Sequence, residues 1–357
     1  MNRTLCLTAI ASLLVGCNLL LGTEAPVIRQ EGTGGTGTSG VVASVGVGGE
    51  GDPISISGPG SGGSATSAAG GATGVCGDGS WAHWPVGGAH EYQIFTGSTL
   101  EQSVTDSLTG LDWQRTSSTK SVSWSQADTH CKLLKWADKT GWRLPTRMEL
   151  LSIVDYSKAW PSVDGVLFPE TTSDPYWTSS HSMYLPQPSG TAFWQVSFAD
   201  GGMFPGMAGS GLGQIRCVRA GAAPASTGSG AACYRYDITD TTARDIETGL
   251  TWERASSDQP LLREDAAGRC GKLQIAGKSW RLPTIAELAS ILDEEKPYAP
   301  RLDPGAFPGG GLAEADWYWS STSDAVKPSA AAWSIRVLNG TVSELSSPGP
   351  AYVRCVY

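Results

Sequence analysis

One short motif with potentially reactive side chains occurs twice in the chain. The letters WRLPT stand at residues 142–146 and again at residues 280–284, and each is followed three residues later by a glutamate. An arginine close to a carboxylate could form a polar site, because functional sites often gather charged groups with shifted pKa values. The same letters also fit a structural role, since Thr-x-x-Glu is the pattern of a helix capping box. We expect the structural role and keep a polar site formed by Arg143 and Glu149 as the alternative.

In the structural interpretation, each threonine caps a helix and each glutamate returns a hydrogen bond to the cap. The tryptophans are expected in the core, and each arginine is expected to pair with a nearby carboxylate. The residues assigned to this structural motif are Trp142, Arg143, Thr146, Glu149, Trp280, Arg281, Thr284 and Glu287. The carboxylates considered as arginine partners are Asp106, Asp245, Asp155 and Asp293.

Other residue types that support catalysis do not occur in the required patterns. The four histidines, His83, His90, His130 and His181, show neither H-x-x-x-H nor H-E-x-x-H spacing, so we expect no zinc site. Nucleophile-elbow, Walker and dinucleotide motifs are lacking outside Gly-rich, compositionally biased sequence. We therefore expect no catalytic residue, no metal and no cofactor. The net charge of −9 also argues against a nucleic-acid partner.

The N-terminus indicates export and lipid attachment. Arg3 precedes an apolar run from Leu5 to Val15, which is too short to span a bilayer comfortably. The run ends in Leu-Val-Gly-Cys17, which resembles a bacterial lipobox. We expect residues 1–16 to be a signal peptide and Cys17 to be lipidated, the alternative being an ordinary secretory signal. The expected location is the outer membrane or cell surface of a Gram-negative bacterium, with the membrane bound through the lipid anchor.

Composition then divides the chain. All 14 tryptophans lie at or after Trp81, whereas residues 31–74 are mostly Gly, Ser, Thr, Ala and Val. A segment without large apolar side chains cannot form a core, so we expect residues 17–75 to be a disordered, flexible tether.

The sequence after the tether is a duplication. TGLDWQR at 109–115 aligns with TGLTWER at 248–254, YWTSS at 176–180 with YWSST at 318–322, and IRCV at 215–218 with VRCV at 353–356. The offset stays close to 139 throughout. We expect a first domain at 76–220 (its core at 100–220), a linker at 221–232 and a second domain at 233–357.

The cysteines can be paired from this alignment. Export favours disulfides, and six cysteines remain after Cys6 and Cys17 are set aside. Cys131–Cys217 and Cys270–Cys355 occupy equivalent places in the two copies, and each bond would close a loop of about 86 residues and stabilise by about 4 kcal/mol. Elimination leaves Cys76–Cys233.

Each copy follows the same order of elements. A helix with a buried stripe is expected at Ala127, Cys131 and Leu134 in the first copy and at Ala266, Cys270 and Leu273 in the second. The capped helix follows, and then several short strands. This order predicts an α+β domain with two helices and antiparallel strands.

Aromatic residues near the late strands divide into two groups. Trp177 and Trp319 are duplicated and are expected in the core. His181, Tyr184 and Trp317 are each specific to one copy, which makes them candidates for exposed contacts. The ligand-binding residues stay unknown at this level.

The combined motifs (D-x-x-TGL-x-W-x-R, WRLPT-x-x-EL, YW-[TS]-S and RCV) resemble the bacterial family named after the C-terminal domain of the collagen-like adhesin Lcl. The resemblance covers both copies and implies a C-type-lectin-like fold in exported proteins that are often lipoproteins. Members of the family mostly lack an assigned activity, and the namesake binds sulfated glycosaminoglycans as a trimer. However, residues 100–220 hold 10 Lys and Arg against 11 Asp and Glu, and residues 233–357 hold 13 against 17, so a polyanionic ligand is not expected.

These observations favour a non-enzymatic, lipid-anchored surface protein that binds or adheres to a glycan or protein partner. One alternative is a cell-envelope enzyme or enzyme accessory that uses Asp106, Asp245, Glu149 and Glu287 in a shared cleft. The other is a purely structural component of the envelope. The oligomeric state is not indicated.

Overall fold

A computed structural model describes the chain after the tether, with short gaps. The described residues are 82, 84–117, 120–182, 191–220, 235–293, 301–308, 317–346 and 349–357. The expected signal peptide, Cys17, the tether, the linker, the Cys76–Cys233 bond and Tyr184 lie outside these residues. Within them, no helix is long and apolar enough to cross a membrane.

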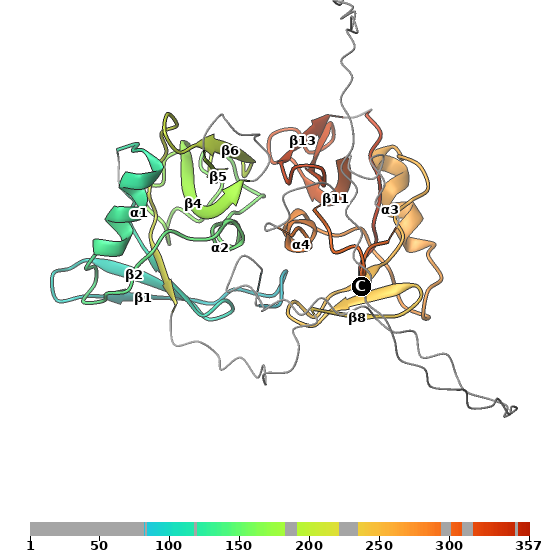
Figure 1. The fold of residues 1–357 in the computed structure, drawn as a ribbon, viewed down its shortest axis with the longest axis horizontal. Helices are drawn as coiled ribbons and strands as arrows, with labels where there is room; N and C mark the ends of the chain where they lie inside the picture. Colours follow the sequence, from blue (N-terminus) through green and yellow to red (C-terminus); the bar gives the residue numbers. More distant parts are fainter. Residues whose placement is uncertain are drawn as a thin grey trace, which may run out of the picture. The chain divides into compact units, whose positions relative to one another are not determined.

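The first copy contains two helices and two groups of antiparallel strands (Figure 1). Its elements are β1 (Tyr92–Thr96), β2 (Gln102–Asp106), β3 (Leu111–Gln114), α1 (Trp124–Leu133), α2 (Arg147–Leu151), β4 (Pro175–Ser182), β5 (Ala192–Ser197), β6 (Met203–Met207) and β7 (Val218–Ala220). Strands β1, β2, β3 and β7 form a four-stranded sheet in that order. Strands β4, β5 and β6 follow one another in a second sheet.

The second copy repeats this order. Its elements are β8 (Tyr236–Ile238), β9 (Thr242–Asp245), β10 (Thr251–Glu253), α3 (Arg263–Gly271), α4 (Ile285–Ser290), β11 (Trp317–Ser323), β12 (Ala331–Arg336) and β13 (Val342–Ser346). Strands β8, β9 and β10 form a three-stranded sheet, and Trp252 in β10 bridges to Val356 where β3 pairs with β7 in the first copy. The structure is therefore a mixed α+β arrangement in two copies, as the sequence predicts.

Helix α1 begins at a local capping sequence and buries one face. Ser123 precedes α1, and its amide donates a hydrogen bond to Gln126 Oε1 at 3.0 Å, as in a capping box. The buried stripe is Ala127 and Cys131. The expected third member, Leu134, lies just beyond the end of α1, although it packs against the same apolar cluster. In Figure 1, α1 lies beside β4 and α3 beside β11.

Each copy has a small core of its own, built from aligned residues. In the first copy it includes Cys131, Trp142 and Trp177, and in the second Cys270, Trp280 and Trp319. Both copies also contribute to a larger apolar cluster that contains Trp194 from β5 and Trp333 from β12. The two copies therefore share part of one core.

A continuous sheet also joins the copies. Strand β13 pairs antiparallel with β6 through Val342 and Met203, which gives a six-stranded sheet in the order β11-β12-β13-β6-β5-β4. Tyr156 meets Trp333 edge to face, with ring centroids 5.1 Å apart. The buried Arg147 donates from Nη1 to the carbonyl of Gly340 at 3.0 Å.

Two disulfides connect α1 and α3 to the terminal segment of each copy. Cys131 is bonded to Cys217 and Cys270 to Cys355, and in both pairs the Cα atoms are 5.5 Å apart. These are the two within-copy bonds that the repeat alignment predicts.

Candidate functional site

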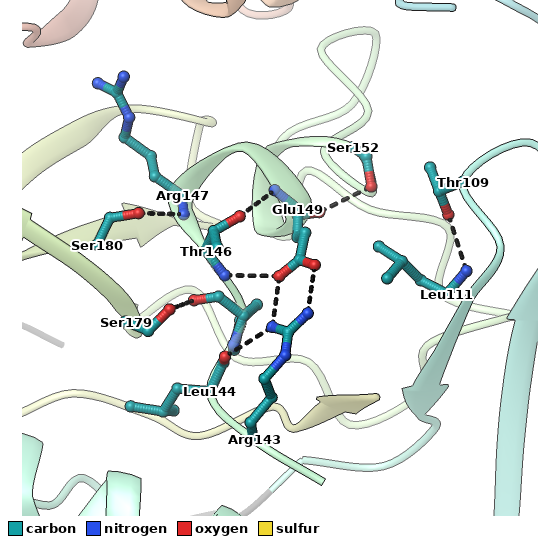
Figure 2. Close-up of polar contacts among 11 residues, drawn as sticks. Thr109, Leu111, Arg143, Leu144, Thr146, Arg147, Glu149, Ser152, Ser179 and Ser180 are labelled. Atoms are coloured by element: carbon teal, nitrogen blue, oxygen red, sulfur yellow. Dashed lines mark hydrogen bonds and ion pairs between the residues drawn. The ribbon is translucent and has the colours of Figure 1, made fainter. Parts of the chain in front are cut away.

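The repeated motif forms the entry to a short helix. In the first copy, Thr146 stands before α2 with an extended backbone, and its Oγ1 accepts a hydrogen bond from the Glu149 amide at 3.1 Å. Glu149 Oε2 accepts in return from the Thr146 amide at 2.7 Å (Figure 2). This reciprocal pair satisfies amides that have no partner inside the helix. The predicted capping box is therefore present.

The same glutamate binds the arginine of the motif. Arg143 Nη1 lies 2.7 Å from Glu149 Oε2, and Nη2 lies 2.6 Å from Oε1 (Figure 2). This two-pronged contact matches the planar guanidinium to the carboxylate. The hydrogen bond to Glu149 raises the pKa of Arg143, while burial works in the opposite direction. The Glu149 side chain is buried, whereas that of Arg143 is 41% exposed.

The second copy reproduces this geometry. Arg281 lies 2.7 and 2.6 Å from the two carboxylate oxygens of Glu287. The Thr284 amide donates to Glu287 Oε2 at 2.7 Å. The same local arrangement therefore occurs in both copies. In each copy, the arginine, threonine and glutamate of the motif are bonded to one another.

Each arginine of the motif does pair with a nearby carboxylate, but three of the four aspartates considered for this role bind other residues, so the assignment to these three is wrong. Asp106 pairs with His90 at 2.8 Å, Asp245 with Arg235 at 2.6 Å, and Asp155 with Lys158 at 2.8 Å. The arginines instead bind the capping glutamates, because the turn between Arg143 and Glu149 brings the ends of these side chains together.

Asp106 is part of a turn. Its carboxylate accepts from the Leu108 amide at 3.0 Å and from Thr109 Oγ1 at 2.8 Å, which is the bonding of an Asx-turn. Burial alone would raise the pKa of Asp106, but the hydrogen bonds from His90 and Thr109 outweigh it and hold the pKa below its usual value. Asp245 accepts from the Glu247 and Thr248 amides in the second copy.

The four carboxylates that an enzyme of the alternative hypothesis would use are buried. Asp106 and Asp245 are fully buried, and Glu149 and Glu287 are nearly so. They take part in turns, caps and ion pairs within their own copies.

The repeated tryptophans lie in the core. Trp142 and Trp280 are buried and donate from the indole nitrogen to the carbonyls of Lys139 and Ile275. Trp177 and Trp319, both fully buried, donate to the carbonyls of Val122 and Leu261. These tryptophans occur in both copies because they pack in the core of each copy.

The copy-specific candidates are more accessible. His181 is exposed and lies edge to face with Phe193, with ring centroids 4.5 Å apart. Trp317 is half-buried and pairs with Arg336 across strands β11 and β12. His83 lies outside the described residues. Within those residues, no group of three or more His, Cys, Asp or Glu is arranged to hold a metal ion.

Two features were missed at the level of the sequence. Asp112 is buried beneath Lys139 and Arg219, at 3.0 and 2.7 Å. The second is Trp160, whose side chain is 64% exposed on a loop of the first copy. The available signal for Trp160 was its lack of a tryptophan counterpart in the second copy.

Comparison with known proteins identifies the repeated unit. The family model described as the Lcl C-terminal domain matches residues 102–219 and again residues 241–357. A comparison with curated proteins gives no match. The two matched segments span both sets of aligned motifs, including both capping boxes and both disulfides. The chain therefore belongs to the Lcl C-terminal domain family and carries two copies of its domain in tandem.

Proposed function

We propose that this chain is a non-enzymatic adhesion protein, anchored to the cell envelope through a lipid on Cys17, that binds a surface glycan or protein with its tandem domains. The observation that carries the proposal is the use of the shared polar residues. In both copies the arginine, threonine and glutamate of the motif are bonded to one another. The two glutamates are also buried, whereas a catalytic carboxylate must be able to reach its substrate.

The features specific to one copy support a binding role. His181 and Trp160 are exposed, and aromatic side chains are common in contact surfaces because they bury much area with few rotatable bonds. The lipobox and the two disulfides support export. The acidic balance of both domains favours a ligand that is not a polyanion.

Anchoring and binding are tested together in a Gram-negative host that produces the full chain. We expect wild-type chain to incorporate an alkyne-labelled fatty acid and Cys17→Ser to lose the label. Cells with the wild-type chain are expected to adhere to one or more coatings in a panel of immobilised glycans and extracellular proteins, above cells without the chain. Unchanged labelling of Cys17→Ser would contradict the anchor. Wild-type cells that adhere to no coating would contradict the binding function.

A further inference from the structure

A loop in the first copy holds a tryptophan outside the core. The loop closes through the Asp155 amide, which donates to the Ser162 carbonyl at 2.9 Å. The Trp160 amide donates to the Ala199 carbonyl at 3.0 Å, and the Ser162 amide to the Phe198 carbonyl at 2.7 Å. These bonds attach the loop to the residues that follow β5, so the backbone that carries Trp160 is held in place.

The position of Trp160 is unusual for such a side chain. Among the tryptophans within the described residues, Trp160 alone is exposed, while the rest are buried or half-buried. Its backbone has φ 61°, in the left-handed region that bulky residues rarely adopt. Residues held in such conformations cluster at ligand-contacting sites, where surrounding structure enforces them. Because most of the indole is not packed, the apolar core does not explain why this residue is tryptophan.

Three charged side chains stand on this loop or directly after it. Lys158 Nζ lies 2.8 Å from Asp155 Oδ2 and 3.8 Å from Asp164 Oδ2. The side chains of Lys158 and Asp164 are each 45% exposed, and that of Asp155 is 33% exposed. The two carboxylates also accept hydrogen bonds from the backbone amides of Ser157, Val166 and Leu167. This segment thus offers an exposed indole together with partly exposed charged groups whose remaining hydrogen-bonding positions water reaches.

This combination fits one class of ligand. A pyranose ring has a face of C–H groups that can pack on an indole, and hydroxyl groups at its edge that bond to carboxylate and ammonium groups. The two carboxylates and one ammonium give the loop a charge of about −1, which disfavours sulfated or uronic sugars. We infer that Trp160, together with Asp155, Lys158 and Asp164 close to it in the sequence, forms a subsite for an uncharged hexopyranose unit of a surface glycan. This inference rests on the proposed binding function and narrows it to one ligand class and one copy.

The second copy provides an internal comparison. Its loop is closed in the same way, by the Asp293 amide on the Arg301 carbonyl at 2.9 Å. The sequence there reads Ala299-Pro300 where the first copy has Trp160-Pro161. The position aligned with Trp160 is therefore an alanine, with Tyr298 directly before it outside the described residues, and the inference concerns the first copy alone.

The test uses the full chain, solubilised with its anchor in detergent, on an array of neutral, sulfated and uronic oligosaccharides. We expect wild-type protein to bind neutral hexopyranosides, with an affinity that changes little between low and high salt. Trp160→Ala is expected to weaken binding at least 10-fold, and Trp160→Tyr to retain part of it. The matched control is Phe95→Ala, which removes another exposed aromatic ring (45% exposed) from β1 and should bind as the wild type does. Thermal unfolding of each variant shows whether it is folded.

The outcomes separate the two proposals. If a folded Trp160→Ala variant still binds neutral glycans as the wild type does, the subsite is overturned, but the adhesion function stands. An empty array, with cells that still adhere to protein coatings, also overturns the subsite alone. Binding confined to sulfated glycans and lost at high salt overturns the assignment of ligand class. Failure of both the array and the cell adhesion assay overturns both proposals.

Discussion

Replacing the capping glutamates with glutamine tests whether the repeated motif is structural. Each carboxylate accepts three hydrogen bonds. For Glu149 these come from the Thr146 amide at 2.7 Å and from the two terminal nitrogens of Arg143 at 2.7 and 2.6 Å. Glutamine has the same shape but only one acceptor oxygen. In Glu149→Gln, the new NH₂ group must therefore face either Arg143 Nη2, or both Arg143 Nη1 and the Thr146 amide.

The expected cost follows from the bond that is lost. A hydrogen bond to a charged group contributes about 1.5–3 kcal/mol. The Arg143 side chain is 41% exposed, so water can solvate the released guanidinium and the cost falls toward the lower end of that range. We expect Glu149→Gln to lower the free energy of unfolding by about 2 kcal/mol. Thr146→Ala, which removes only the cap acceptor, should cost about 1 kcal/mol.

The second copy offers a matched variant. Glu287 makes the same three contacts at 2.7, 2.7 and 2.6 Å, so Glu287→Gln should cost about as much as Glu149→Gln. Urea unfolding of the full chain with its disulfides intact, followed by tryptophan fluorescence, measures both. A Glu149→Gln variant with wild-type stability but without ligand binding would refute the structural role and establish the Arg143–Glu149 pair as a binding site.

Three further predictions concern the first copy. Replacing both Cys131 and Cys217 with serine should lower the free energy of unfolding by about 4 kcal/mol, measured by urea unfolding; a change below about 1 kcal/mol would show that the loop is already restricted in the unfolded chain. Because the pKa of Asp106 is lowered in the folded protein, the stability it adds is present above the unfolded value of 3.8 and is lost as the pH falls through the lower folded value. The urea midpoint should therefore fall less steeply below about pH 4 in Asp106→Asn than in the wild type, and equal slopes would remove Asp106 from the acid response. Trp160→Asn should stay within about 0.5 kcal/mol of the wild type, because asparagine tolerates positive φ and a mostly exposed side chain is lost; a loss of about 3 kcal/mol, as for a core tryptophan, would show that the indole supports the fold.

Local patterns in the sequence predicted the local structure well. The capping box depends on residues three apart, so Thr146 and Glu149 could be assigned without knowledge of the rest of the fold. The duplication supplied the disulfide pairs, because equivalent cysteines occupy equivalent places. The partner of Arg143 was less predictable, since several carboxylates lay within reach along the chain and only the path of the turn selects Glu149.

Contacts between segments far apart in the chain could not be predicted from the sequence. Nothing in the letters around Arg147 indicates that its guanidinium bonds to Gly340 in the other copy. The exposure of Trp160 was also unexpected, because large aromatic residues are mostly buried and one sequence does not distinguish a displayed indole from a packed one. The Asp-x-x-Thr spacing at Asp106 did contain a usable signal, as it is typical of an Asx-turn.

The pairing of β13 with β6 has a consequence for how readily the sheet edges of this protein associate with other chains. An unpaired edge strand invites association with other chains, and each copy on its own would leave such an edge where the other copy now pairs. Because both copies lie in one chain, each edge is covered by the other copy, and this covering does not depend on protein concentration. Part of the core is held in common as well, so the two copies support each other within one molecule.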